Sequence, residues 1–432
     1  MVSGPRYAFA VMKFTRRRLI QGLGGLSAVA WHIKGTAEAA SEYDPAAMPA
    51  SSPALIALPD KRNFIFEGTD LNAAYTHPVG NFTRAALETY LNSRQRDAGR
   101  NWPVQNSRDD AVALFSGLIN AAPADVAVVP STLEGENLIG ASLGLGPGKG
   151  VVTDAFHYDA SLVRYSELQK KGMPLIVVRN TGNRIDYSEL EAAISPETRL
   201  VAISWVSSAT GYRHDLKRVC DIAHRKGALV YADIIQGVGA VPLDVKECGV
   251  DFCCAGSYKW LMGEFGVAFL YVRPDRLRDL KRVQLGWRGI TAYTHHFLPF
   301  DSPGPIAGDY VLGTDTARLF EVSTPDWSGL AAMTGALGYL QKLGVSRIAR
   351  YREPMLDRLQ SELPKYGFAA LTPADHRGPY VWFWKKGMGE QYYQALKKAK
   401  IHVTLTRNRI RISPSVYNDM ADVERLMRVL AA

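Results

Sequence analysis

Seven short apolar runs alternate with helix-length segments between residues 125 and 272, and this alternation limits the fold of the chain more than any other feature. The runs are DVAVVP (125–130), GVVTD (150–154), PLIVV (174–178), LVAISWV (200–206), ALVYAD (228–233), DFCCAGS (251–257) and VAFLYV (267–272). Helical patterns lie between most of them, as at 216–226, where apolar residues recur at three- and four-residue spacing. Strands with few polar interruptions, separated by helices, predict an α/β fold with a large, mostly parallel seven-stranded sheet that is covered on both faces.

The pattern along the chain predicts four parts. Residues 1–40 form a targeting segment, and residues 41–75, which begin with a stretch rich in Ala, Pro and Ser, form an N-terminal arm. Residues 76–327 form the large domain. From residue 328 a helical pattern is followed by short strands and helices, so 328–432 are predicted to form a smaller C-terminal α+β domain. Residues 273–327 are rich in aromatics, Gly and Pro and lack periodicity, and a long irregular stretch of this kind is usually functional.

The first forty residues have the pattern of an export signal. The basic run TRRR (15–18) precedes a short apolar, glycine-rich stretch (21–33), and AEA (37–39) supplies the small residues of a cleavage point. A twin arginine in such a segment is typical of the export route for folded proteins, so a twin-arginine signal peptide and a periplasmic or secreted protein are predicted. The alternative is a basic terminus without a targeting role. The apolar stretch is too short for a permanent anchor, so no stable membrane insertion is expected.

Charge and cysteine content exclude two other classes of protein. The net charge of +9 falls to +4 without the first forty residues, which hold six basic side chains and one acidic side chain. The rest has no long basic run and no base-reading motif, so no nucleic acid partner is expected. The cysteines are Cys220, Cys248, Cys253 and Cys254. They lack C-x-x-C spacing and a matching histidine pattern, which argues against a metal site.

Polar residues at the ends of the predicted strands are the candidates for a site, because ligands bind outside the carboxyl ends of the strands in such sheets. Four runs end in such residues: Ser131 and Thr132 after the first, Ser207 and Ser208 after the fourth, Asp233 and Gln236 at and after the fifth, and Ser257, Tyr258 and Lys259 after the sixth.

Together these residue types fit one cofactor. Ser131 and Thr132 open a helix, and a helix N-terminus binds phosphate because its unpaired N–H groups and dipole favour an anion. Asp233 would keep a pyridine nitrogen protonated, and Lys259 would hold an aldehyde as a Schiff base. Each residue alone has a commoner explanation, as a turn residue, a helix cap or a surface lysine. Their order and spacing as a set predict pyridoxal 5′-phosphate (PLP).

The sequence resembles the class V aminotransferase-like enzymes, which are fold type I PLP-dependent transferases. The blocks that carry the resemblance are LNAAYTHP (71–78), STLEGEN (131–137), RLVAISWVSSATGYRHDL (199–216), the stretch from VYADIIQ to VAFLYV (230–272), LFEVSTPDWSGL (319–330) and IRISPSVYNDMADVERL (410–426). They recur in the family's order over most of residues 70–430. Isopenicillin-N-epimerase-like proteins and periplasmic enzymes that modify peptide siderophores are similar as well.

Carried over residue by residue, the resemblance implies roles at both ends of the site. Lys259 would form the Schiff base with the cofactor, and Asp233 would pair with the pyridine nitrogen. Gln236 and Ser208 would approach the phenolic oxygen, although many relatives have Asn where Ser208 stands. Arg411 would bind the substrate carboxylate, a task suited to a planar guanidinium group.

A second set of residues would hold the phosphate and the ring face. Thr324 matches a residue that reaches the phosphate of the neighbouring subunit, which implies a homodimer with shared active sites. The others are Thr132, Ser257 and Tyr258 on the phosphate, Ser131 through its backbone, and either His157 or Tyr158 stacked on the ring.

We therefore expect a PLP-dependent enzyme that acts on an amino acid, or on an amino-acid residue of a small peptide, after Lys259 removes the α-proton. An aminotransferase is the first expectation, and an epimerase or a β-eliminating lyase is the alternative. Cysteine desulfurases need a nucleophilic cysteine shortly before the carboxylate-binding arginine, and residues 255–432 contain none. Desulfurase activity of that type is therefore not expected.

Two other classes fit the sequence less well. A non-catalytic PLP-binding protein would be expected to lack Lys259 or Arg411, and both are present. A nucleotide-binding protein would be expected to have G-x-G-x-x-G between the first strand and a helix, whereas the glycine-rich SLGLGPGKG (142–150) precedes a strand.

Overall fold

The computed structural model describes residues 56–96, 104–297, 299–301 and 308–432. The predicted signal peptide (1–40) and the first part of the predicted arm (41–55) lie outside the described residues. Among the described residues, no helix has both the length and the apolar character that a membrane crossing requires.

A seven-stranded sheet forms the centre of the fold, in the order β2-β10-β9-β8-β7-β3-β4. Neighbouring strands are parallel except for β10, which is antiparallel to both β2 and β9. All seven apolar runs are strands of this sheet, and the mostly parallel α/β fold predicted from them is confirmed. The strands are β2 (Val126–Val129), β3 (Gly150–Asp154), β4 (Leu175–Val178), β7 (Thr198–Ser204), β8 (Leu229–Asp233), β9 (Phe252–Gly256) and β10 (Ala268–Val272).

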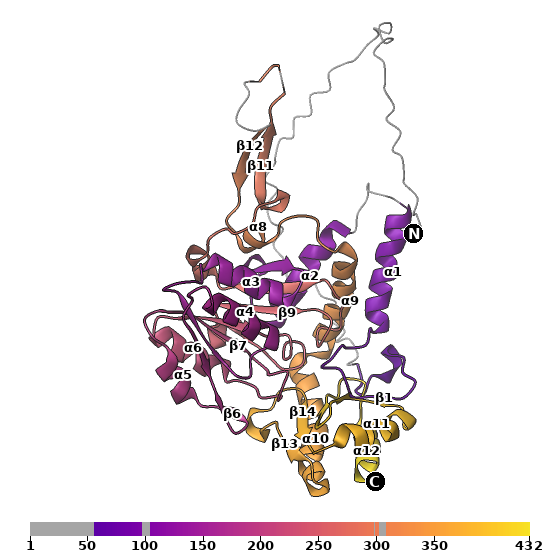
Figure 1. The fold of residues 1–432 in the computed structure, drawn as a ribbon. Helices are drawn as coiled ribbons and strands as arrows, with labels where there is room; N and C mark the ends of the chain where they lie inside the picture. The colour runs from indigo at the N-terminus through magenta and orange to yellow at the C-terminus, as the bar shows by residue number, and fades with distance from the viewer. Residues whose placement is uncertain (1–55, 97–103, 298, 302–307) are drawn as a thin grey trace, which may run out of the picture. The chain divides into compact units, whose positions relative to one another are not determined.

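Successive residues of each strand join different hydrophobic clusters on the two faces of the sheet, because side chains alternate along a strand. In β7, Leu200 belongs to one cluster and Val201 to the other. Cys253 and Cys254 of β9 divide in the same way, and both are buried free thiols. Helices cover both faces (Figure 1): α3 (Thr132–Ser142) and α4 (Asp159–Gln169) on one, and α2 (Val104–Leu118), α6 (Leu216–Arg225) and α9 (Trp327–Leu343) on the other.

The C-terminal part forms a smaller α+β layer with its own hydrophobic cluster. Its antiparallel sheet has the order β13-β14-β17-β16, and its helices are α10, α11 and α12. The bounds are β13 (Ala369–Ala370), β14 (Val381–Trp384), β16 (Thr404–Leu405), β17 (Arg409–Ile412), α10 (Val345–Glu362), α11 (Met388–Lys398) and α12 (Met420–Ala431).

The two ends of the described chain meet in this layer. Leu71, from the predicted arm, is buried in the C-terminal cluster, and β1 (Thr69–Asp70) pairs in parallel with β15 (Ile401–His402). Helix α9 begins close to residue 328, where the small domain is predicted to begin. Most of its buried side chains nevertheless belong to the cluster of the large sheet, and it packs against α1 (Asn81–Arg96) and α2 (Figure 1). Apolar periodicity predicts a buried helix but does not say which core buries it.

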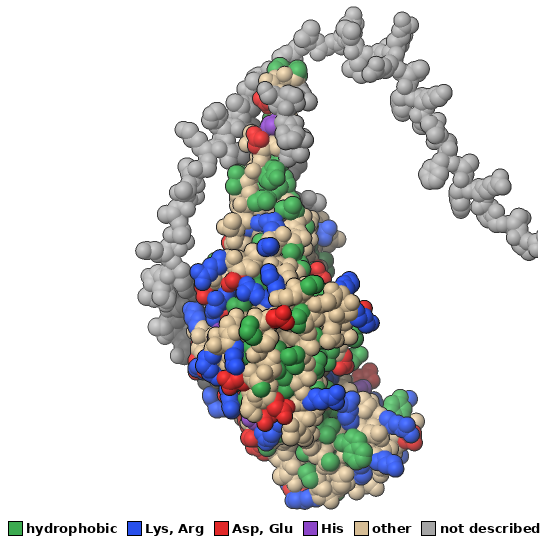
Figure 2. All heavy atoms as spheres, turned by 60° about the vertical axis from the view of Figure 1, so that its left-hand side comes forward, with side chains coloured by type: hydrophobic (Ala, Val, Ile, Leu, Met, Phe, Trp, Pro, Cys, Tyr) green, Lys and Arg blue, Asp and Glu red, His purple; other side chains and the backbone are tan. Residues whose placement is uncertain are grey.

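The irregular stretch after β10 contains an antiparallel hairpin of β11 (Ile290–His295) and β12 (Gly308–Leu312), which projects from the sheet in Figure 1. It carries exposed apolar side chains, Tyr310 and Val311 among them, and Figure 2 shows hydrophobic surface on it. The other short α-helices and strands of the described residues are α5 (Tyr187–Ala193), α7 (Val245–Cys248), α8 (Thr316–Phe320), β5 (Asn180–Thr181) and β6 (Arg184–Ile185).

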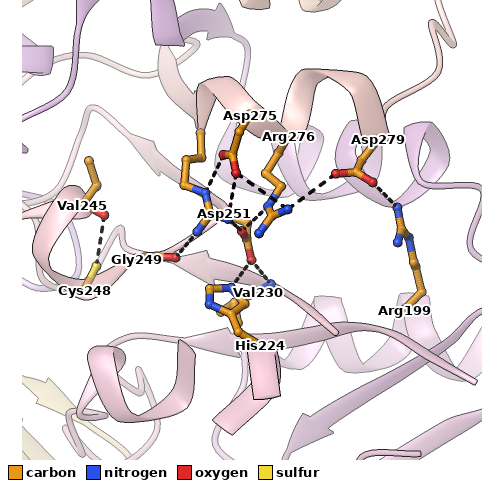
Figure 3. Close-up of polar contacts among 11 residues, drawn as sticks. Arg199, His224, Val230, Val245, Cys248, Gly249, Asp251, Asp275, Arg276 and Asp279 are labelled. Carbon is orange, nitrogen blue, oxygen red and sulfur yellow. Dashed lines mark hydrogen bonds and ion pairs between the residues drawn. The ribbon is translucent and has the colours of Figure 1, made fainter. Parts of the chain in front are cut away.

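Asp251 lies directly before β9, at the amino-terminal ends of the central parallel strands and away from their carboxyl ends. Its carboxylate connects several elements there. Its carboxylate accepts hydrogen bonds from His224 Nε2 (2.7 Å), Arg276 Nε (2.7 Å) and the backbone N–H of Val230 (2.8 Å), as Figure 3 shows. Arg273 Nη2 lies 2.9 Å away. Burial raises the pKa of Asp251, but the hydrogen bonds from His224 and Arg276 outweigh it, so this pKa lies below its ordinary value.

Replacing Asp251 by Asn is expected to lower the free energy of unfolding by about 3 kcal/mol at pH 7, because the cationic partners lose a buried counter-charge. Urea unfolding at matched cofactor saturation measures this loss. The folded-state pKa is lower than the unfolded value of about 4, so the stabilisation is present above that value and is lost as the pH falls through the folded-state pKa. The difference between wild type and variant should therefore shrink on acidification.

Asp275→Asn is the matched control, because the half-exposed Asp275 contacts the same arginine, Arg273, at 2.7 Å. It is expected to change stability by about 0.5 kcal/mol or less. Equal destabilisation by both variants would show that the buried carboxylate of Asp251 contributes no more to stability than the half-exposed carboxylate of Asp275.

Candidate active site

A cavity of about 210 Å³ opens at the carboxyl ends of the central parallel strands. Eight of the residues predicted from the sequence line it: Ser131, Thr132, Tyr158, Ser208, Asp233, Gln236, Tyr258 and Lys259. A larger cavity of about 520 Å³, beside Arg213 and His376, shares no lining residue with it and is bordered by both basic and acidic side chains.

The strand register brings these residues together. Ser204 of β7 pairs with Asp233 of β8, and Asp233 pairs with Cys254 of β9, so the three strands end at the same level. The turn after β8 then lies against the loop that follows β9. Gly239 in that turn has φ +87°, and a Cβ there would lie 2.5 Å from the carbonyl oxygen of Trp260. Only glycine accommodates this approach without strain.

Lys259 is partly buried, and it lines the cavity rather than lying on the open surface. It lies in the turn after β9, where its carbonyl accepts a hydrogen bond from the N–H of Met262 (2.9 Å). Burial lowers the pKa of Lys259 to about 8; the carboxylate of Asp233 acts in the opposite direction, and Arg411 lowers it further. A substantial fraction of the Nζ groups is therefore neutral near pH 8 and able to accept a proton.

Asp233 is buried at the end of β8, where one carboxylate oxygen accepts a hydrogen bond from the N–H of Ile235 (3.0 Å). Burial raises the pKa of Asp233 to about 6, although this hydrogen bond and the charges of His157 and Lys259 oppose the shift. The carboxylate is incompletely compensated by the protein, so a cation bound in the cavity would stabilise its ionised form.

The start of α3 forms one end of the cavity. Ser131 is the N-cap, with its Oγ accepting a hydrogen bond from the N–H of Glu134 (3.1 Å), and Thr132 Oγ1 accepts one from the N–H of Gly256 (2.8 Å). Ser257 differs from the prediction in its placement. Its side chain is fully buried, its hydroxyl donates to the carbonyl of Glu264, and it does not line the cavity.

Arg411 lies on β17 and is 5% exposed. Its Nη2 donates to Thr404 Oγ1 (3.0 Å), and its guanidinium lies over the rings of Tyr380 and Trp382. The buried Nε has no hydrogen-bond partner among the described residues. Arg411 does not line the cavity, but its charge lowers the pKa of Lys259. A guanidinium that has a free N–H donor and lies near the Lys259 amine is suited to bind the carboxylate of a substrate.

The two candidates for the ring-stacking position are placed differently. Tyr158 is 43% exposed and lines the cavity, whereas His157 is buried behind its wall and does not line it. Thr324 is separate from both. It lines another cavity, with Gln284 and Glu321, that has no residue in common with the Lys259 cavity.

Glu136 and Tyr75 are among the residues of the site that sequence reasoning missed. Glu136 lines the cavity four residues after Thr132 on α3. Residues four apart share a helix face, so the spacing from a predicted phosphate ligand was a usable signal. Tyr75 is 66% exposed, and its phenol is close enough to Arg411 and Tyr258 to influence their pKa values. Its position in LNAAYTHP carried no comparable signal.

The polar groups of the cavity fit PLP. The buried Oε1 of Gln236 has no hydrogen-bond partner among the described residues, while its Nε2 donates to the carbonyl of Ala74 (3.2 Å). A Cβ at Gly256 would lie 3.3 Å from Thr132 Oγ1 and would narrow the end of the cavity next to α3. An amine, a carboxylate and a helix N-terminus in one cavity are the partners that an aldehyde, a pyridinium and a phosphate require.

Comparisons with known proteins agree with this geometry. The model of the family "Aminotransferase class-V" matches residues 86–426. The chain belongs to the class V aminotransferase family. The uncharacterized aminotransferase YcbU of Bacillus subtilis (strain 168) is 29% identical over 335 residues, which cover 77% of this chain and 86% of YcbU.

Two solved structures resemble the fold of this class V family member. The apo structure of a cysteine desulfurase from Thermococcus onnurineus NA1 has a TM-score of 0.78 at 22% identity and covers 88% of this chain and 98% of its own. A mutant of C-DES with glycine covalently linked to the PLP cofactor has a TM-score of 0.75 at 19% identity, covering 86% and 99%. Membership of the class V aminotransferase family, together with this fold, makes the protein a fold type I, PLP-dependent enzyme.

Replacing Lys259 by Ala is expected to remove the visible absorption of the bound cofactor, because no other described amine lines the cavity. Borohydride treatment should then fail to fix the cofactor covalently, and activity should fall about 100-fold or more with the loss of the base. Lys170→Ala, which removes an exposed amine, is the control and should retain the band. Covalent fixation in the Lys259→Ala protein would contradict the assignment.

Proposed function

We propose that the protein is an aminotransferase that acts on an amino acid or on an amino-acid residue of a small peptide. The observation that carries this proposal is the Lys259 amine, which lies in the cavity, has a pKa lowered to about 8, and interacts electrostatically with both Asp233 and Arg411. This is the arrangement expected of a base that removes a proton from a carbon next to a bound carboxylate.

Different residues of the site would bind the cofactor, bind the substrate and transfer the proton in such a reaction. Thr132 and the N-terminus of α3 would hold the phosphate of PLP, and Asp233 would hold its pyridine nitrogen in the protonated form. When bound, PLP serves as the electron sink for the electrons left at the α-carbon. Arg411 binds the substrate carboxylate, and Nζ of Lys259 takes the α-proton and delivers it to its new position.

The bonding of His157 favours transamination over epimerisation. Lys259 alone can move one proton between two neighbouring carbons, whereas inversion at the α-carbon needs a second group on the opposite face. His157 is the nearby imidazole, and both of its nitrogens already have partners in the protein, Ser204 and Glu136. It is therefore poorly placed for a second proton transfer.

Desulfuration through a protein thiol is not supported. The cysteines are all buried, and burial raises the pKa of each thiol. A thiol of this kind is a poor nucleophile. β-Elimination remains the second candidate, because it uses the same lysine base without a protein thiol, and a similar solved structure is a complex of the cystine C-S lyase C-DES with cysteine persulfide. A non-catalytic role is disfavoured because Lys259 and Arg411 are both in place.

Holoenzyme incubated with a panel of amino acids and short peptides is expected to form keto acids together with the aminated cofactor. Release of ammonia or sulfide, or racemisation without keto acid, would contradict the aminotransferase assignment and identify a lyase or an epimerase. With the substrate so found, Arg411→Gln should raise KM about 10- to 100-fold through the loss of a charged hydrogen bond. Arg407→Gln, an exposed arginine four residues earlier, is the control and should leave KM unchanged.

We also propose that the protein is a homodimer exported by the twin-arginine route to the periplasm or beyond. The TRRR run supports export, and the separation of Thr324 from its own Lys259 cavity supports a role for Thr324 in the site of a second subunit. Export in the folded state would also allow the cofactor to be loaded before transport.

Protein recovered from the periplasmic fraction is expected to have the mass of a dimer by light scattering. The double variant Arg16→Lys, Arg17→Lys should remain in the cytoplasm, since lysines preserve the charge but not the twin-arginine signal. A monomer in the first measurement, or normal export in the second, would contradict the respective proposal.

A further inference from the structure

Glu136 and His157 form a buried ion pair in the wall of the Lys259 cavity. His157 Nε2 lies 3.1 Å from Glu136 Oε1, and His157 Nδ1 lies 3.0 Å from Ser204 Oγ. The two side chains are 1% and 0% exposed. Both ring nitrogens of His157 are thus occupied by protein groups, and water does not reach either one.

The surroundings of Glu136 favour its ionised form. The hydroxyl of Tyr165 donates to Oε1 (2.6 Å), and the hydroxyl of Ser161 donates to Oε2 (2.5 Å). With His157 Nε2, three potential donors surround the two oxygens, which is the environment of a carboxylate and not of a carboxylic acid. An ionised Glu136 in turn requires a hydrogen on Nε2 of His157.

A buried carboxylate also needs a positive charge nearby. Arg164 on α4 is another cation nearby, but its Nε donates to Asn137 (2.5 Å) and its guanidinium lies over the ring of Tyr165. His157 is therefore the cation in direct contact with Glu136.

The three carboxylates that act most strongly on His157 shift its pKa in the same direction. Glu136 approaches from α3, Asp154 from β3 and Asp233 from β8, while Ser204 of β7 and Tyr165 of α4 are neutral neighbours. Burial lowers the pKa of His157, but these carboxylates, Glu136 first, outweigh it and raise this pKa above its ordinary value. Burial raises the pKa of Glu136, and the imidazolium and the three hydrogen bonds together bring it below its ordinary value.

We infer that Glu136 is a positioning residue that holds His157 as an imidazolium bonded at both ring nitrogens. His157 then acts on the cofactor cavity through a fixed positive charge and takes no part in proton transfer, which falls to Lys259. The charge has a defined target, because it helps to keep the neighbouring Asp233 ionised. Only the assignment of proton transfer to Lys259 rests on the proposed function; the protonation of His157 does not.

The protonation of His157 can be measured in the full-length protein by nitrogen NMR of labelled histidine rings, with and without PLP. The His157 signals are assigned by their loss in His157→Gln. The wild-type ring is expected to remain doubly protonated from pH 6 to pH 8. In Glu136→Gln the proton affinity should fall about 10-fold or more, which is one unit in the titration midpoint or more. A neutral wild-type His157 at pH 7 overturns the inference without any variant, even if Glu136→Gln fails to fold.

Ser161→Ala is the matched control, because it removes a hydrogen bond from the same carboxylate and keeps the charge. The His157 midpoint should move by less than about half a unit in this variant. Equal shifts in Ser161→Ala and Glu136→Gln would mean that packing, and not the charge of Glu136, sets the protonation of His157, and would overturn the inference.

Exchange of the substrate α-proton with deuterated solvent tests the second half of the inference. His157→Gln should slow exchange about 10-fold or less, since it removes only a charge, whereas Lys259→Ala should slow it about 100-fold or more. Equal losses would make His157 a proton-transfer group and would overturn its role as a fixed charge. If no amino acid exchanges its α-proton in the wild type, the proposed function fails, while the NMR result on His157 still stands by itself.

Discussion

In the central sheet, Ser204, Asp233 and Cys254 lie side by side across three parallel strands. All the other features of the site depend on this register. It brings the acid at the end of β8 next to the turn that carries Lys259, and it places the hydroxyl of Ser204 where His157 can reach it. A slip of one residue would turn Asp233 to the other face of the sheet and leave the lysine without its counter-charge.

Two buried aspartates at opposite ends of this sheet show how hydrogen bonding separates a structural role from a functional one. Asp251 is surrounded by donors, its pKa is lowered, and it has little capacity left for a ligand. Asp233 has one backbone donor, and burial raises its pKa to about 6. The protein supplies too few donors to offset the burial of this negative charge. The folded state is therefore less stable without a bound cation next to Asp233. A bound pyridinium would supply this positive charge, so part of the stability of the folded protein is expected to depend on its cofactor.

The sequence was sufficient for the large sheet, because seven apolar runs of strand length leave few alternatives, and for the residues at the strand ends, because parallel strands end at a common edge. The sequence was insufficient where contacts between distant elements decide which partner a side chain has. Ser257 has the right position in the chain, but its hydroxyl is taken by a carbonyl of its own loop. Helix α9 has the periodicity of a buried helix, but it packs into the hydrophobic core of the large sheet and not into that of the small domain. Glu136 reads as an ordinary helical glutamate until its three hydrogen-bonding partners, which come from α4 and the turn before it, are brought beside it.

The pairing of β1 with β15 has a consequence for the order in which the protein is completed. The N–H of Ala74 donates a hydrogen bond to Ser413 Oγ, and the carbonyl of Ala74 accepts one from Gln236 in the cofactor cavity. The first contact spans 339 residues of sequence. A growing chain can therefore form most of its central sheet early, but this side of the cavity closes only after Ser413 has left the ribosome. Such long-range closure is slow, and cofactor retention is therefore expected to depend on whether the segments around Ala74 and Ser413 have come together.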